Sequence, residues 1–175
     1  MTWHLAQLNI GRLRAPTEDP ATGDFMANLD QINALAEATP GFVWRLQTDE
    51  GNATAIRAFD GDPLMILNMS VWESVESLAD YVYRSDHTPF LRRRGEWFER
   101  LSEIYLVLWW IPAGTVPTIE EALVRLEHLK SHGPTGDAFT FRQRFPHPDG
   151  PIASGACLPI SSSFAAWPPP TTVSP

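Results

Sequence analysis

The chain has very little cysteine: Cys157 is the single one among 175 residues. One cysteine excludes an internal disulfide and any cysteine-based metal cluster within one chain, and is typical of a reducing, cytoplasmic setting. Basic residues are also scarce, with 13 Lys and Arg against 21 Asp and Glu, for a formal net charge of -8. Because nucleic-acid binding needs a net basic surface, we expect no nucleic-acid partner.

Long hydrophobic runs are absent as well. No segment approaches the roughly 20 apolar residues of a membrane-spanning helix, and no basic region precedes an apolar stretch at the N-terminus. We therefore expect a soluble, cytoplasmic protein without a membrane partner. The sequence also lacks a glycine-rich phosphate loop, a GxSxG motif and HxH or HExxH spacing, which argues against nucleotide-dependent enzymes, serine hydrolases and a preformed zinc site.

The composition changes after Gly150. Residues 151–175 are rich in Pro and Ser, contain no Asp, Glu, Lys or Arg, and are predicted to form a disordered or loosely docked tail. Residues 1–150 are long enough for one compact domain with its own core.

Within residues 1–150 the hydrophobic pattern alternates between the periods of strands and helices, which predicts an α+β domain. Strands are predicted at 4–10, 42–48, 64–72 and 104–111, with 55–59 extending the pairing. Helices are predicted at about 25–36, 74–100 and 119–130, the last with a capping box of Thr118 and Glu121. A final strand is predicted at 138–145.

The order of these elements up to residue 111 is β-α-β-β-α-β, the ferredoxin-like arrangement, followed by an added C-terminal helix and strand. A sheet of this type has one face under its helices and one face bare. Because burying the second apolar face takes another sheet, we expect a homodimer.

The segment 83–98 concentrates residues suited to chemistry beside a proline-marked break. A Thr-Pro pair at 88–89 is typical of an N-cap and first helical position. His87, Phe90, Arg94 and Trp97 are spaced i, i+3, i+7 and i+10, so they line one stripe if the helix continues through the break. If the chain has a site, it is predicted here.

Three side chains of this segment are candidate catalytic residues. His87 is predicted to act either as a general base or as a haem or metal ligand, with capping of the preceding helix as the structural alternative. Arg94 is predicted either to bind a carboxylate or enolate oxygen or to form a salt bridge with Asp80 or Glu99. Tyr83 is predicted either to hydrogen-bond the substrate or the imidazole, or to pack at the edge of the core.

Further candidates would bind the substrate. Asn9 and Asn68 are amides within apolar strands, which must find partners when buried, so they either orient a ligand or hydrogen-bond each other. Trp44, Phe90 and Trp97 are predicted to wall a pocket for a flat aromatic ligand, with simple packing as the alternative.

Five segments together resemble a known bacterial family, the one catalogued as domain of unknown function 3291, over residues 3–146: HLAQLNIGRL, NMSVWESVESLADYVYRSDH, LRRRGEWFERL, YLVLWWIPAG and HGPTGDAFTFRQRFP. That family is similar to the dimeric α/β-barrel superfamily of antibiotic-biosynthesis monooxygenases and haem-degrading enzymes. The resemblance implies a ferredoxin-like protomer, a back-to-back sheet dimer forming a dimeric α/β barrel, and a cavity in each protomer between sheet and helices.

The resemblance to haem-degrading relatives is incomplete. Asn9 and the segment Trp72-Glu73-Ser74, at the start of the helix predicted at 74–100, match their pattern. Tyr81, however, stands where their helix tryptophan would fall, and His87 comes about one helical turn too early for their haem-binding histidine. Cofactor-free members of the superfamily oxidise electron-rich aromatics with Asn, Trp, Tyr and His side chains, which this chain also contains.

These observations predict a small-molecule enzyme, a monooxygenase-like oxidoreductase that acts on an aromatic or apolar metabolite without a cofactor. The first alternative is a haem-binding protein or haem-dependent enzyme with His87 as axial ligand. The second is a non-catalytic ligand-binding or stress-response dimer.

Overall fold

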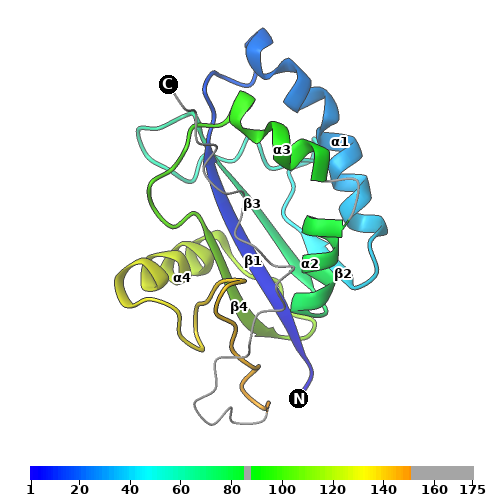
Figure 1. Cartoon of the computed structure of the whole chain (residues 1–175), viewed down its shortest axis with the longest axis vertical. Helices are drawn as coiled ribbons and strands as arrows, with labels where there is room; N and C mark the ends of the chain where they lie inside the picture. The colour runs from blue at the N-terminus through cyan, green and yellow to red at the C-terminus, as the bar shows by residue number, and fades with distance from the viewer. Residues whose placement is uncertain (85–87, 151–175) are drawn as a thin grey trace, which may run out of the picture.

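An antiparallel sheet of four strands forms the centre of the computed structural model, which describes residues 1–84 and 88–150 (Figure 1). The strands are β1 (Trp3–Arg12), β2 (Phe42–Arg45), β3 (Met65–Trp72) and β4 (Leu106–Pro112), in the order β2-β3-β1-β4. Most residues of β1 and β3 are buried, as expected for strands whose alternate side chains are covered on both faces of the sheet.

The helices of the described residues are α1 (Gly23–Ala38), α2 (Val75–Arg84), α3 (Thr88–Trp97) and α4 (Ile119–His132), with a short 3-10 helix η1 (Pro20–Thr22) before α1. Up to β4 the order is β-α-β-β-α-α-β, with α2 and α3 together in the place of the second helix, and the strand order β2-β3-β1-β4 confirms the predicted ferredoxin-like topology. The helical region predicted at 74–100 consists of two helices, and α3 begins at Thr88, where the Thr-Pro pair predicts a helix start. None of the helices in the described ranges is long and apolar enough to span a membrane.

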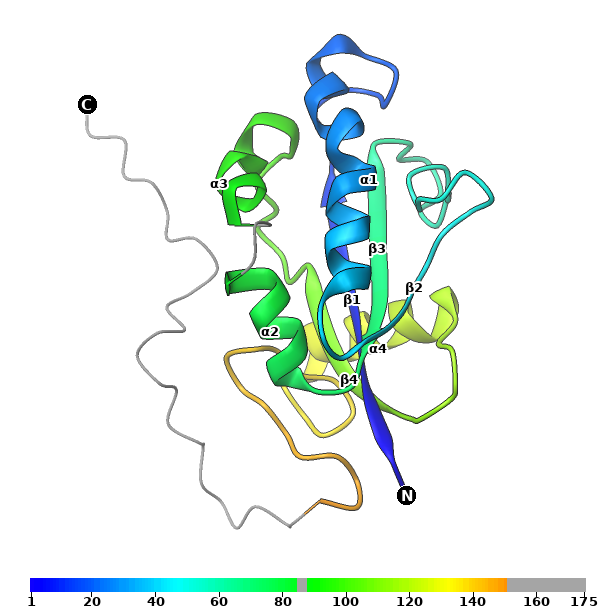
Figure 2. The ribbon, with the colours of Figure 1, turned by 90° about the vertical axis from the view of Figure 1, so that its right-hand side faces the viewer.

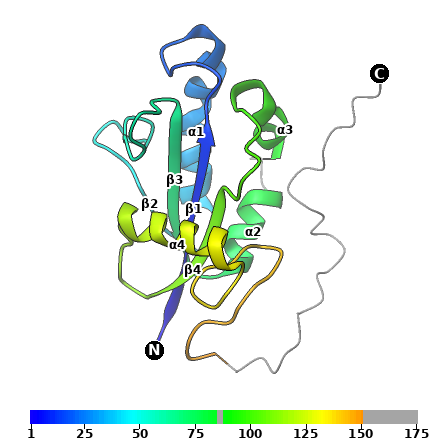
Figure 3. The ribbon, with the colours of Figure 1, turned by 90° about the vertical axis from the view of Figure 1, so that its left-hand side faces the viewer.

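Helices lie on both sides of the sheet. α1, α2 and α3 cover one side, in front in Figure 2, and α4 covers the other, in front in Figure 3. We call the first side, which carries Leu5, Gln7 and Asn9 of β1, the cavity face. The second side, which carries Ala6 and Leu8, is the α4 face.

The α4 face is buried within one chain. Leu8, Val107 and Trp109 are completely inaccessible to solvent there, beneath Leu126 and Leu129 of α4. The predicted reason for a homodimer, a bare second face, is therefore wrong. The homodimer itself stays a prediction, which a measurement of molecular mass in solution would check.

The start and end of α4 follow the predicted signals. Thr118 Oγ1 accepts a hydrogen bond of 3.1 Å from the Glu121 backbone N–H, and Gly133 ends the helix with a positive φ of 74°. Glu121 Oε1 in turn accepts a 3.1 Å hydrogen bond from Trp109 Nε1 of β4. The cap thus also fixes α4 on the sheet.

Two predicted strands are wrong. Residues 55–59 form no strand, and Ile56 and Phe59 pack against the α4 face instead of extending a strand pair. In the predicted last strand, 138–145, there are only two isolated bridges, of Ala138 with Thr135 and of Phe139 with Leu108 of β4. The chain then turns at 140–143, where the Thr140 N–H donates to Gln143 O at 3.3 Å.

Candidate functional site

A cavity of about 200 Å³ lies between the cavity face and the three helices α1, α2 and α3. Its walls include Phe25 and Ile32 of α1, Tyr81 of α2 and Trp97 of α3. An apolar cavity of about 150 Å³ holds benzene, so this volume suits a ligand of one or two fused rings.

The floor of the cavity is polar. We define the polar floor as Gln7 and Asn9 of β1 with Asn68 and Ser70 of β3, all of which line the cavity. The register places Asn9 opposite Asn68 and Gln7 opposite Ser70, so the four side chains form a compact patch on one face of the sheet. The flanking residues of that face are apolar, Leu5 and Trp72 at one end and Ile66 at the other.

Arg94 lies beside two aromatic rings at one end of the cavity. Its guanidinium carbon is 4.8 Å from the ring centre of Tyr105 and 5.5 Å from that of Phe98. Gly11 lets the Phe98 ring lie directly on β1, because a Cβ at residue 11 would come within 2.8 Å of Phe98 Cδ1. The result is a fixed cation with flat apolar surfaces on its flanks.

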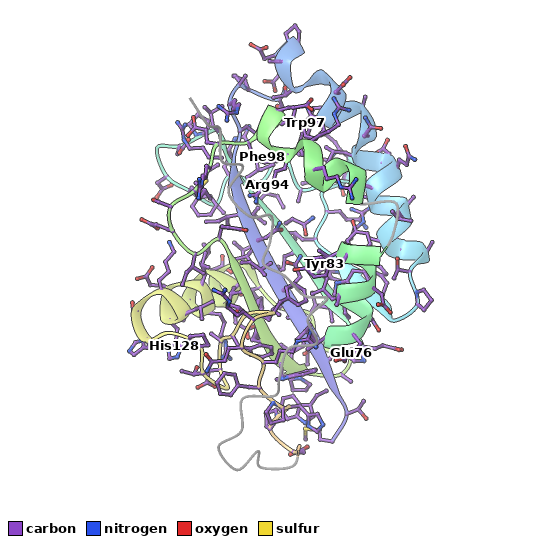
Figure 4. All side chains as sticks on the ribbon, in the orientation of Figure 1. Glu76, Tyr83, Arg94, Trp97, Phe98 and His128 are labelled. Atoms are coloured by element: carbon purple, nitrogen blue, oxygen red, sulfur yellow. The ribbon has the colours of Figure 1, made fainter. Side chains whose placement is uncertain are left out.

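Contacts with α1 and β1 hold α3 in place. Arg93 Nη2 donates to Asp24 Oδ2 of α1 at 2.8 Å, and Phe25 of α1 packs edge-on against Phe98 with ring centres 5.1 Å apart. Trp97 is only 4% exposed, and its backbone O accepts a 2.8 Å hydrogen bond from the backbone N–H of Arg14, which follows β1. In Figure 4 Arg94, Trp97 and Phe98 accordingly group together, with Tyr83 on α2 apart from them.

The charged side chains that line the cavity are arginines. Among the described residues, Arg45 and Arg94 line it and no carboxylate does. Arg45 is paired with Glu37 Oε1 at 2.8 Å and also donates to Gly51 O at 2.8 Å, so it ties α1 to the 46–54 segment. The electrostatics of the cavity therefore favour a ligand with negative charge over a cationic one.

Two tyrosines in the cavity are protonated at neutral pH. Burial raises the pKa of Tyr81, whose ring stacks on Trp72 with centres 5.2 Å apart. Burial also raises the pKa of Tyr105, an effect that the charge and hydrogen bond of Arg94 partly offset. The Tyr105 phenol is thus a neutral polar group next to the guanidinium.

The structure brings together four of the predicted site residues: Asn9, Asn68, Arg94 and Trp97 all line the cavity. Their predicted roles in binding or catalysis stay predictions. His87 lies outside the described residues, as does the side chain of Phe90. The predicted stripe through the Thr-Pro break is therefore described only for its second half, on α3.

Two predicted residues lie elsewhere. Trp44 packs against the α4 face, on the opposite side of the sheet, so its predicted role in walling the pocket is wrong. Tyr83 is not part of the cavity lining and packs edge-on against Phe141 with ring centres 5.7 Å apart, and burial raises its pKa. This position matches the core-edge alternative for Tyr83 better than contact with a ligand.

Several lining residues were not predicted. Gln7 lies two residues before Asn9 on β1, and Ser70 lies two residues after Asn68 on β3. Because side chains two residues apart in a strand share a face, this spacing could have predicted that Gln7 and Ser70 line the same site. Tyr105, just before β4, gave no such signal. No group of three or more His, Cys, Asp or Glu side chains that could hold a metal ion occurs within 1–84 and 88–150.

Comparison with known proteins gives one family match. Residues 4–154 match the family described as Domain of unknown function (DUF3291). No curated protein matches the sequence.

Several solved structures are similar to the chain at low identity. The structure of SnoaB, described as a cofactor-independent oxygenase from Streptomyces nogalater, is 13% identical with a TM-score of 0.43, covering 65% of this chain and 95% of that chain. PA3566 from Pseudomonas aeruginosa is 12% identical with a TM-score of 0.43, covering 66% and 98%. The monooxygenase ActVA-Orf6 of Streptomyces coelicolor, in complex with nanaomycin D, is 15% identical with a TM-score of 0.36, covering 67% and 93%. Similarity of this degree says nothing about the reaction of this chain.

Proposed function

The chain belongs to the DUF3291 family, and on that premise we propose that it is a monooxygenase-like enzyme that oxidises a small aromatic metabolite in the cavity without a cofactor. The observation that carries the proposal is the position of Arg94 in an aromatic-walled cavity, beside the rings of Tyr105 and Phe98. The reaction class rests on the superfamily resemblance of the sequence, and the ligand class rests on the cavity.

The proposed reaction begins with a phenol of one or two rings. A base removes the phenolic proton, and Arg94 stabilises the resulting oxyanion, which makes the ring electron-rich enough to react with dioxygen. A new C–O bond forms at the ring carbon opposite the oxyanion, whose hydrogen is lost. One oxygen atom ends as a carbonyl and the other leaves as water, so a naphthol and O₂ give a naphthoquinone and H₂O.

The side chains of the described residues have defined tasks in this scheme. The rings of Trp97 and Phe98 hold the aromatic plane of the substrate and exclude water, which strengthens the attraction between Arg94 and the oxyanion. Tyr105 is positioned to hydrogen-bond the same oxygen. His87 remains the predicted base, and His87→Ala should then abolish turnover without preventing binding.

Ligand binding tests the role of Arg94 independently of any turnover. The ligands 2-naphthoate and 2-naphthamide have almost the same shape and differ in charge, and tryptophan fluorescence reports binding beside Trp97. Since a hydrogen bond to a charged group contributes more than one to a neutral group, we expect the anion to bind at least about tenfold more tightly. Arg94→Gln should remove this preference, whereas Arg92→Gln, at an exposed position of the same helix, should keep it.

Oxygen uptake with 1-naphthol tests the reaction itself. We expect consumption of one O₂ for each 1,4-naphthoquinone formed, in metal-free buffer and without added flavin or haem. Selective binding of naphthoate without any oxygen uptake from 1-naphthol or related phenols would instead support the non-catalytic ligand-binding alternative. Equal binding of naphthoate and naphthamide by the wild type would refute the role of Arg94.

A further inference from the structure

The polar floor has fixed directions of hydrogen bonding. Trp72 Nε1 is a donor only, and it donates to Ser70 Oγ at 2.8 Å. Gln7 Nε2 donates to the same Ser70 Oγ at 3.1 Å and to Asn68 Oδ1 at 2.9 Å. Both acceptor sites of the Ser70 hydroxyl are therefore used, and its own hydrogen is left to donate.

The Ser70 hydroxyl is buried and lies against the cavity. Ser70 and Gln7 are each only 6% exposed, and both line the cavity. A hydroxyl that accepts two hydrogen bonds in such a place needs an acceptor for its hydrogen, because an unused polar group away from water is unfavourable. A ligand in the cavity can supply that acceptor.

Asn9 presents the opposite polarity. Its Oδ1 is buried and accepts no hydrogen bond from any residue that the structure describes. Asn9 pairs with Asn68 across β1 and β3, and Ser70 is two residues further along β3, so Asn9 and Ser70 are diagonal neighbours. Diagonal neighbours on a sheet are roughly 7–8 Å apart. The Ser70 hydroxyl and the Asn9 side chain are thus separated by about the length of one aromatic ring. Because Asn9 Oδ1 has no solvent-accessible surface, a ligand in the cavity reaches this acceptor only when the amide turns about its last side-chain bond.

We propose that the polar floor selects aromatic ligands that carry a carbonyl at one end of a ring and a hydroxyl at the opposite end. The carbonyl oxygen accepts from the Ser70 hydroxyl, and the ligand hydroxyl donates to Asn9 Oδ1. This selection rests on the proposed function in one respect, that the cavity holds the aromatic ligand. It makes Asn9 and Ser70 specificity-determining residues, in addition to Arg94.

Three related ligands separate the two contacts. The compound 6-hydroxy-1-tetralone carries both groups at opposite ends of its aromatic ring, 1-tetralone lacks the hydroxyl, and 5,6,7,8-tetrahydro-2-naphthol lacks the carbonyl. In slightly acidic buffer, where the phenol is protonated, we expect 6-hydroxy-1-tetralone to bind about fivefold to tenfold more tightly than either of the others, as for the loss of one hydrogen bond each.

Two substitutions assign the contacts to residues. Asn9→Ala should bring 6-hydroxy-1-tetralone and 1-tetralone to equal affinity, while keeping the advantage of the carbonyl. Ser70→Ala should do the reverse, giving equal affinity for 6-hydroxy-1-tetralone and 5,6,7,8-tetrahydro-2-naphthol. Because Ser70→Ala also removes the acceptor of Trp72 Nε1 and destabilises the fold, Asn9→Ala, which leaves the network of Ser70 intact, serves as the independent test.

The outcomes distinguish this inference from the proposed function. Equal affinity of the three ligands for the wild type, or a loss in Asn9→Ala that is the same for all three, would overturn the selection by the floor even if 1-naphthol is oxidised. Selective binding that depends on Asn9 would support it even if no oxygen is consumed. That second outcome would refute only the proposed oxidation.

Discussion

Replacing Asn9 with leucine should stabilise the protein while it removes selectivity for a ligand hydroxyl. Asn9 Oδ1 is buried and accepts no hydrogen bond from the described residues, and an unsatisfied buried acceptor costs about 1–3 kcal/mol of stability. Leucine has nearly the shape of asparagine, and its neighbours at this level include Leu106 of β4 and the pocket residue Ile66. For a chain of this size each kcal/mol raises the melting temperature by about 2–4 °C, so the expected increase is about 2–12 °C.

Asn68→Leu is the matched control, on the strand opposite. Asn68 Oδ1 accepts the 2.9 Å hydrogen bond of Gln7 Nε2, so its replacement leaves one of the two Gln7 Nε2 hydrogens without an acceptor and should lower the melting temperature. Calorimetry and urea unfolding, with an unchanged dependence on urea, would measure both variants. If Asn9→Leu melts at or below the temperature of the wild type, or if the two variants shift in the same direction, the assignment of Asn9 as an unsatisfied acceptor is refuted.

The tyrosines and His87 give two further predictions. Burial raises the pKa of Tyr81, Tyr83 and Tyr105, so above about pH 10 the folded chain retains protons that the unfolded chain releases, and the free energy of unfolding should fall as the pH rises further. Phenolate absorbance should then appear together with the loss of the helical circular dichroism signal, and phenolate in a fully folded protein near pH 10 would contradict this. For His87, the cofactor-free proposal predicts that added hemin gives no Soret band dependent on this residue; a band that His87→Ala removes would establish the haem alternative.

The fold was largely predictable because local signals agreed with the long-range arrangement. The Thr118 cap and the glycine after α4 fixed that helix, and alternation fixed β1 and β3. The predicted strand at 138–145 failed for a physical reason. Phe139, Phe141 and Phe145 all pack into the apolar cluster beside Trp110, so their spacing reflects a loop that contributes aromatic side chains to the core and not a strand pair.

Trp44 shows why a face cannot always be assigned from spacing. Phe42 and Trp44 are two residues apart and would share a face in a regular strand. The register between β2 and β3 shifts between these residues, with Phe42 opposite Trp72 and Trp44 opposite Val71. This irregularity turns Phe42 toward the cavity face and Trp44 toward the α4 face. Nothing in the sequence of β2 indicates the shift.

The polar floor was predictable from the sequence only in part. The sequence indicated Asn9 and Asn68 because amides in apolar strands need partners, but it did not indicate which atoms those partners leave unused. That result depends on the β1 and β3 register, which aligns Gln7 with Ser70, and on Trp72, whose indole N–H occupies the Ser70 oxygen. A sequence that optimised stability alone would place a leucine at residue 9. A buried amide whose oxygen accepts no bond from the described residues is better explained by a ligand that donates to it, and the thermal stability of Asn9→Leu with and without 6-hydroxy-1-tetralone separates these two explanations.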